Sequence, residues 1–168
     1  IDADAYSDRK WLEMLVQTMI REENNAVACV GGPGLVPPDD TPKAKAIGYT
    51  TMHPLINAGN RNNARWHESR YVDHHPFFNM LCKRWVIEKV GRLNEDFDIG
   101  EDVEYGWRIR KAGYKILYIP NAIVYHHRRS SIKALAKQMF RYGIWRATLR
   151  YISWEIVTPL HFVPSLLL

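Results

Sequence analysis

The sequence predicts an α/β fold built around one core, and three observations support this class. Segments with apolar residues at helical spacing alternate along the chain with short apolar runs that are typical of buried strands. The 168 residues are about the length of one domain, and 46% of them are hydrophobic while 24% are charged. No internal repeat or low-complexity segment interrupts this pattern. The composition therefore excludes a wholly disordered or fibrous chain.

The first part of the chain predicts a helix, a strand and a loop. Ser7 or Asp8 can cap a helix that has apolar residues along one face and ends near Glu22. The apolar run over 26–30 precedes two glycines, which predicts a buried strand that opens into a turn. Residues 33–42 are rich in proline and aspartate, so we expect them to cross the surface.

The second part of the chain predicts three helices and two strands. These are helices over 82–90 and 101–112, strands over 114–119 and 122–126, and a long helix from Ser130 or Ser131 to about Arg150. Gly91 and Gly113 each follow a predicted helix, where a glycine favours a left-handed cap. The polar stretch over 57–70 predicts irregular structure.

Charge and cysteine content indicate which kind of partner and which redox compartment to expect. A net charge of +5 and a pI near 9.2 favour an anionic partner, which is a nucleic acid, a membrane surface or a phosphorylated small molecule. Cys29 and Cys82 lie far apart without a CxxC pattern, so we expect no disulfide framework or thiolate zinc site, and a reducing compartment. Ile1 opens a polar stretch that does not fit a signal peptide, so we expect an excised piece.

Two acidic groups are candidates for chemistry. Asp2-Ala3-Asp4 places two carboxylates on either side of one small residue, and such oxygen ligands suit Mg²⁺ or Mn²⁺ bound with substrate phosphates. Glu101 and Asp102 begin a predicted helix, directly after Gly100. Acidic residues are also common as helix caps or solvated loop residues, so both interpretations stay open for each group.

Four segments follow one another along the chain: Asp2-Ala3-Asp4 and residues 91–102, 108–114 and 120–126. Their order and spacing resemble the catalytic region of family 2 glycosyltransferases, which are inverting, nucleotide-sugar-dependent enzymes of the GT-A fold. Asp2-Ala3-Asp4 resembles the DxD metal motif of that family, and residues 91–102 resemble its "GG-F-x-E … GED" segment. Residues 108–114 are similar to its "R-x-x-x-G-Y" helix end, and residues 120–126 to its strand with a terminal metal-binding histidine. The resemblance spans nearly the whole chain.

The resemblance implies roles for individual residues. Asp4 would ligate a divalent cation, Mn²⁺ or Mg²⁺, while Asp2 would contact the nucleotide ribose or the metal shell. His126 would be a further ligand or a contact to the diphosphate, and His127 should point to the other side of its strand. Asp102 would be the general base that takes the proton from an acceptor hydroxyl.

Further substrate contacts follow from the same resemblance. Residues 138–142 resemble the family's Q-x-x-R-W element, which places Gln138 and Arg141 near the diphosphate and Tyr142, in place of the usual Trp, beside the acceptor. The change to Tyr leaves single addition of a sugar at least as well supported as processive synthesis. Glu101 is a further candidate for substrate binding. The alternative for the residues on the long helix is ordinary helix surface.

A basic stretch and an apolar tail end the chain. Seven basic residues without an acidic one occupy this stretch: Arg128, Arg129, Lys133, Lys137, Arg141, Arg146 and Arg150. The tail over 151–168 is apolar but interrupted by charge and proline, so it predicts an interfacial element rather than a spanning helix. We expect the basic stretch to meet an anionic membrane surface, at the cytoplasmic face of the membrane, rather than nucleic acid.

The resemblance as a whole implies a partial GT-A fold, a mixed sheet flanked by helices. Residues 1–150 would form the carboxyl-terminal two-thirds of the glycosyltransferase domain, with the nucleoside-binding part missing and the fragment inactive alone. The expected reaction moves a sugar from a nucleotide-sugar donor to a hydroxyl of a glycan or lipid-linked acceptor, in bacterial-type surface polysaccharide or glycan synthesis. The alternatives are a non-catalytic scaffold of the same fold and a basic nucleic-acid-binding module.

Overall fold

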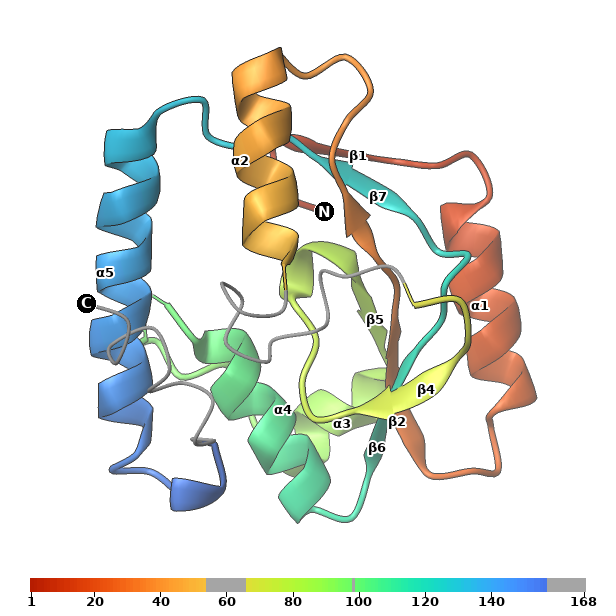
Figure 1. Ribbon diagram of the computed structural model, residues 1–168. Coiled ribbons are helices and arrows are strands. Elements are labelled where there is room, and N and C mark those ends of the chain that lie inside the picture. Colours follow the sequence, from red (N-terminus) through yellow and green to blue (C-terminus); the bar gives the residue numbers. More distant parts are fainter. Residues whose placement is uncertain (54–65, 98, 157–168) are drawn as a thin grey trace.

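A computed structural model describes residues 1–53, 66–97 and 99–156, and its strands form two sheets. The larger sheet is mixed, in the order β4-β6-β2-β5, and the smaller is also mixed, in the order β1-β7-β3 (Figure 1). The strands are β1 Ala5–Ser7, β2 Val27–Gly31, β3 Gly34–Leu35, β4 Arg70–Val72, β5 Met80–Cys82, β6 Lys115–Tyr118 and β7 Val124–His126. This mixed α/β architecture confirms the predicted class and is consistent with a partial GT-A fold.

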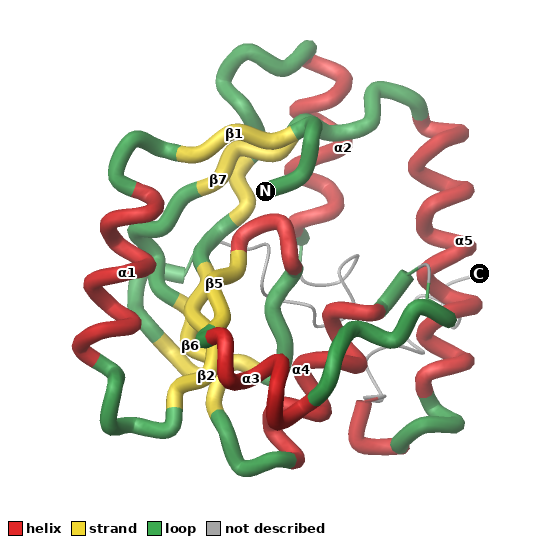
Figure 2. The backbone as a smooth tube through the Cα atoms, turned by 180° about the vertical axis from the view of Figure 1, so that it is seen from behind, coloured by secondary structure: helices red, strands yellow, loops and turns green. Residues whose placement is uncertain are grey.

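Helices cover both faces of the larger sheet. The α-helices are α1 Trp11–Arg21, α2 Pro42–Met52, α3 Arg84–Val90, α4 Glu101–Lys111 and α5 Ile132–Leu149, with short 3-10 turns η2 Phe77–Asn79 and η3 Trp154–Ile156. Successive strand residues point to opposite faces, so Leu117 packs with α1 while Ile116 packs with α3 and α4. Figure 2 shows α1 and α5 on opposite sides of the molecule, with the strands between them.

Caps explain where several helices begin and end. The side chains of Thr41 and Ser131 accept backbone N–H groups of Ala44 and Ala134, which starts α2 and α5 as the sequence predicts for α5. Gly91 has a φ of 90° directly after α3, a conformation that favours glycine. The predicted cap of α1, Ser7 or Asp8, is wrong, because Lys10 is the N-cap and the Asp8 carboxylate accepts the Lys10 N–H from outside the helix.

The expectation about the cysteines is wrong, because Cys29 and Cys82 form a disulfide. Cys82 also does not begin a helix as predicted, but ends β5, and α3 starts after it. The antiparallel ladder between β2 and β5 places the two cysteines directly opposite each other, a register that sequence spacing does not reveal. The cysteine-based argument for a reducing compartment therefore does not hold.

Two predicted segments lie partly outside the described residues. These are the irregular stretch over 57–70, described only from residue 66, and the apolar tail over 151–168, described only to residue 156. Across the described ranges, none of the helices combines the length and apolar character that crossing a bilayer requires.

Candidate functional site

Strand register brings the beginning and the end of the chain together at one point. β1 and β7 pair in an antiparallel register that sets Ala5 opposite His126, and the His127 N–H donates to the Asp4 carbonyl at 3.0 Å. Because Asp4 directly precedes the strand and His126 ends the partner strand, their side chains lie next to each other. The smaller sheet therefore positions this candidate metal centre.

Asp2, Asp4 and His126 form a compact cluster of oxygen and nitrogen ligands. His126 Nε2 lies 3.2 Å from Asp4 Oδ1 and 3.6 Å from Asp2 Oδ2, and one ligand atom from each residue lies within 4.8 Å of the others. Both carboxylates are exposed, which leaves room for further ligands from a substrate. Two carboxylates and an imidazole suit a divalent cation such as Mn²⁺ or Mg²⁺, so the residues present fit the metal that the sequence implies.

The ring of His126 is held in place by packing. Phe78 of η2 stacks on it with ring centroids 5.0 Å apart, and its Nδ1 atom is buried without a hydrogen-bond partner. Burial, and secondarily the Arg128 charge, lower the pKa of His126, although the Asp4 and Asp2 carboxylates oppose this shift. The imidazole is therefore neutral at pH 7, which is the form that ligates metals.

His127 serves another purpose, as the alternation along the strand predicts. Its Nδ1 lies 2.7 Å from Asp40 Oδ1, and Asp40 also accepts the backbone N–H of Arg128. The hydrogen bond to Asp40 raises the pKa of His127, despite some burial. This pair ties the loop before α2 to the end of β7, so it holds the strand end that carries His126.

Asp102 lies in the first turn of α4 and is not a member of the metal cluster. Its Oδ1 accepts the Val103 N–H at 2.8 Å, and Arg146 of α5 acts on its charge. Burial first, and then the neighbouring Glu101, raise the pKa of Asp102 to about 6, while Arg146 and the backbone hydrogen bonds oppose the shift. A carboxylate with this pKa is a stronger base than an ordinary aspartate and is still ionised at pH 7.

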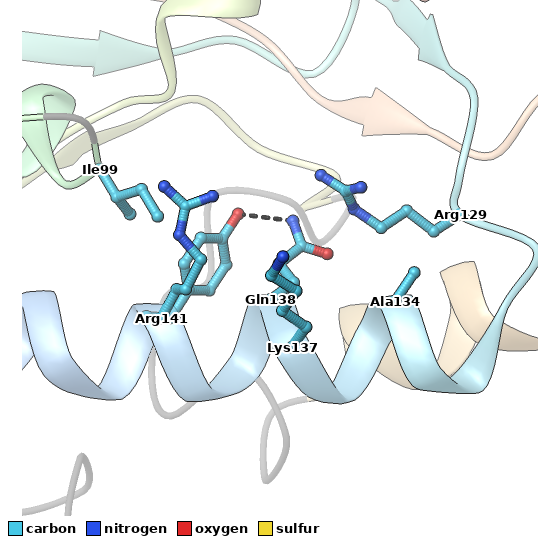
Figure 3. A pocket seen from close by; sticks show the side chains of 7 residues that line it. Ile99, Arg129, Ala134, Lys137, Gln138 and Arg141 are labelled. Atoms are coloured by element: carbon cyan, nitrogen blue, oxygen red, sulfur yellow. Dashed lines mark hydrogen bonds between the residues drawn. The ribbon is translucent and has the colours of Figure 1, made fainter.

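The predicted substrate residues on α5 line a pocket of about 360 Å³. Ile99, Arg129, Ala134 and Lys137 complete its walls around Gln138, Arg141 and Tyr142. In Figure 3 the side chains of Arg129, Gln138 and Arg141 project to the same side of α5, and the Gln138 amide donates to the Tyr142 hydroxyl at 2.9 Å. With three basic side chains and no acidic one in its lining, the pocket suits an anionic ligand.

The structure assembles the predicted site residues into three groups. Asp2, Asp4 and His126 lie together, and the α5 residues share a pocket with one another. Asp102 interacts electrostatically with Arg146 of α5 and with its neighbour Glu101, and no hydrogen bond or ion pair among the described residues joins Asp102 to the metal cluster. Residues of α5 interact electrostatically with the other two groups. Tyr142 stabilises the charge of Arg128, which follows the cluster residue His126 by two positions, and Arg146 stabilises the charge of Asp102.

The sequence did not predict that Phe78 and Arg128 lie beside the metal cluster. Phe78 supports His126 from a segment with no recognisable motif, and only the apolar pair Phe77-Phe78 signals it. Arg128 belongs to the basic stretch that was expected to lie on the surface, yet its Nε atom is buried. Arg146 is likewise partly buried against Asp102, so two of the seven basic residues do not belong to an outward face.

The mixed α/β fold is consistent with a partial GT-A domain, and Asp2, Asp4 and His126 supply the ligand types of a metal site. Comparison with known proteins agrees with this class of fold. Residues 1–144 match the family described as "Glycosyltransferase like family 2". Because this match covers most of the chain, the chain belongs to that family.

The names of individual relatives refer to glycosyltransferases or to polysaccharide biosynthesis. A "Pre-mycofactocin glycosyltransferase" of Mycobacterium tuberculosis is 28% identical over 148 residues, covering 85% of this chain and 29% of that protein. A Methanococcus voltae protein named "Dolichyl N-acetyl-alpha-D-glucosaminyl phosphate 3-beta-D-2,3-diacetamido-2,3-dideoxy-beta-D-glucuronosyltransferase" is 25% identical, with 84% and 43% covered. "Succinoglycan biosynthesis protein ExoA" of Rhizobium meliloti is 30% identical, with 61% and 30% covered. The chain thus spans less than half the length of each of these relatives.

Proposed function

We propose that this chain is part of the catalytic domain of an inverting glycosyltransferase that uses a nucleotide-sugar donor and a divalent metal. The acceptor would be a hydroxyl group of a glycan or of a lipid-linked sugar, in surface polysaccharide or glycan synthesis. Membership of family 2 and the names of the relatives support a glycosyltransferase. The observation that carries the proposal is the cluster of Asp2, Asp4 and His126, because a GT-A enzyme needs such a metal site beside its donor diphosphate.

The proposed reaction assigns a step to each group of residues. Asp102 takes the proton from the acceptor hydroxyl while that oxygen bonds to the anomeric carbon of the donor sugar. The bond from this carbon to the diphosphate oxygen breaks on the opposite face, so one displacement inverts the configuration. When bound, Mn²⁺ or Mg²⁺ supplies positive charge beside the leaving diphosphate. Gln138, Arg141, Tyr142 and Glu101 would orient the substrates.

We also propose that the enzyme works at the cytoplasmic face of a membrane. The exposed side of α5 carries Phe140 and Ile144 beside Lys133, a combination that suits contact with anionic lipid. We favour lipid over nucleic acid as the partner of this helix, because a lipid-linked acceptor would be presented at the same surface.

Two substitutions in the full-length protein test the proposed function. Asp102→Asn should keep the metal-dependent binding of the nucleoside diphosphate, measured by thermal shift, but lower sugar transfer by about 10²- to 10⁴-fold. Asp4→Ala should remove the effect of Mn²⁺ on nucleotide binding. The anomeric configuration of the product, read by NMR, tests inversion.

The exposed Glu88, on α3, provides the control, because Glu88→Gln removes one carboxylate outside the site. Its transfer rate should equal that of the unmodified protein. Transfer by Asp102→Asn at the unmodified rate would show that Asp102 is not the base.

A further inference from the structure

Arg128 follows the metal cluster by two residues and is poorly supplied with hydrogen-bond partners. Its Nε atom is buried and makes no hydrogen bond, and its Nη2 group reaches only the Gly34 carbonyl, at 3.5 Å. Within the described ranges, no carboxylate lies within ion-pair distance of its guanidinium. Burying a cation with so few partners destabilises the fold unless an anion binds to it.

The surrounding fold makes room for this side chain. Arg128 runs past Gly48 of α2, where an added Cβ atom would come within 2.9 Å of the Arg128 Cγ. Its terminal group lies beside Gly34 of β3, and Gly34 in turn packs against Phe78, the residue that stacks on His126. The side chain is therefore enclosed by α2 and the smaller sheet, next to the residues that hold the metal cluster.

Electrostatic contacts connect Arg128 with both sides of the proposed site. The charge of Arg128 lowers the proton affinity of His126, and the Asp4 carboxylate in turn stabilises the charge of Arg128. Tyr142, which lines the α5 pocket, acts on the same guanidinium. Arg128 is thus close enough to Asp4 of the metal cluster and to Tyr142 of the pocket for its charge to act on both.

We propose that Arg128 binds a phosphate oxygen of the donor diphosphate and stabilises its charge as the sugar leaves. A guanidinium presents N–H groups in a planar fork that matches a phosphate, and Arg128 has such groups unused. The carboxylates of Asp2 and Asp4 repel a diphosphate, so Arg128 supplies attraction that does not pass through the metal. This inference rests on the proposed function and adds a residue to it.

Calorimetry on the full-length protein separates this role from a structural one. The probes are Mn²⁺ alone and inorganic pyrophosphate in the presence of Mn²⁺. Arg128→Gln should weaken pyrophosphate binding by about 10- to 100-fold, since a hydrogen bond to a charged group is lost. Binding of Mn²⁺ alone should stay the same or tighten, because a positive charge beside the cluster has been removed.

Two further variants complete the experiment. Arg21→Gln, at the exposed end of α1, removes a positive charge outside the site and should change neither binding constant. Arg128→Lys keeps the charge and most of the stem, so it should fold even where Arg128→Gln does not. It should still bind pyrophosphate about 5- to 10-fold more weakly than the unmodified protein, because an ammonium lacks the planar fork.

The outcomes distinguish the inference from the proposed function. If Arg128→Gln and Arg128→Lys bind pyrophosphate within twofold of the unmodified protein, Arg128 is not a phosphate ligand, although the proposed function stands. If Arg128→Gln loses Mn²⁺ and pyrophosphate binding to the same extent, Arg128 has only a structural role. If the unmodified protein binds no Mn²⁺, the metal-dependent function fails, and the inference fails with it.

Discussion

At the residue scale, the environment of Asp102 destabilises the folded protein but makes the carboxylate a stronger base. The carboxylate is partly removed from solvent at the start of α4 and lies beside the acidic Glu101, and both effects disfavour its charged form. Arg146 compensates only in part, because its own guanidinium is also partly desolvated. A base held in this way is poised to accept a proton, at the expense of the stability of the fold.

Replacing Asp102 by Asn should therefore stabilise the protein at neutral pH. The pKa of Asp102 in the folded protein, about 6, lies above its ordinary value of 3.8, so folding binds a proton and stability falls as pH rises through this range. Asn keeps an oxygen for the Val103 N–H and carries no charge. We expect a gain of at most about 3 kcal/mol in the free energy of unfolding at pH 8, which disappears below pH 4. Chemical denaturation across this pH range measures it, and equal stability at pH 8 would contradict the burial of the charge.

The same pKa predicts the pH dependence of catalysis. Below about pH 6 the Asp102 carboxyl is protonated and cannot accept the proton of the acceptor hydroxyl. The rate of transfer in the full-length protein should fall about tenfold for each pH unit below this value, and level off above it. A rate that stays constant between pH 5 and 7 would exclude Asp102 as the base.

At the scale of single elements, α5 has two different faces. Leu149 and the partly buried Arg146 face α4 and η3, where Leu149 packs with Val103 and Ile156. Phe140 and Ile144 lie on the outer side and are 70% and 51% exposed. Exposed apolar groups next to basic ones are typical of a helix that lies in a membrane interface.

Flotation with vesicles tests the outer face of α5. The full-length protein carrying Phe140→Ser and Ile144→Ser should bind vesicles of anionic lipid less tightly, because the apolar contact is lost. The control is the pair Leu12→Ser and Val16→Ser, which removes similar exposed apolar groups from α1. Binding of the unmodified protein should weaken with salt, since each basic residue near the surface contributes about 1 kcal/mol. Equal recovery with neutral vesicles would exclude the electrostatic part.

At the scale of the whole molecule, Asn79 joins parts that are distant in the sequence. Its amide N–H groups donate to the Pro33 and Ala122 carbonyls, at 3.0 and 2.8 Å, and its oxygen accepts the Trp11 indole N–H at 2.7 Å. The side chain is completely buried. Three segments that lead into β3, β7 and α1 therefore depend on one amide, near the region where the two sheets meet.

Asn79→Ala should destabilise the fold strongly, since it leaves buried polar groups of three segments without a partner. We expect a loss of about 2–5 kcal/mol in the free energy of unfolding, measured by chemical denaturation. Asn24→Ala, at an exposed turn after α1, is the control and should change this free energy by less than about 0.5 kcal/mol. A loss below 1 kcal/mol for Asn79→Ala would show that these hydrogen bonds contribute little.

The sequence by itself determined what depends on neighbouring residues. Helical spacing and caps identified α1, α4 and α5 to within a few residues, and β6 and β7 appeared as apolar runs on either side of Pro120. The family followed from the order of motifs, and the family match confirms it. The roles of Asp2, Asp4 and His126 as metal ligands stay a prediction, for which the cluster that they form is the support. The short strands β1, β3 and β4 have too few residues to show a period, so they were not predicted.

Only the tertiary structure decided which residues meet. The β1–β7 register joins Asp4 to His126, and the β2–β5 register joins Cys29 to Cys82, contrary to expectation. Packing against α2 turned Arg128 inward from a stretch that reads as surface. The physical reason is that caps and periodicity are local properties of the chain, whereas strand register and helix docking depend on contacts between segments far apart in the sequence.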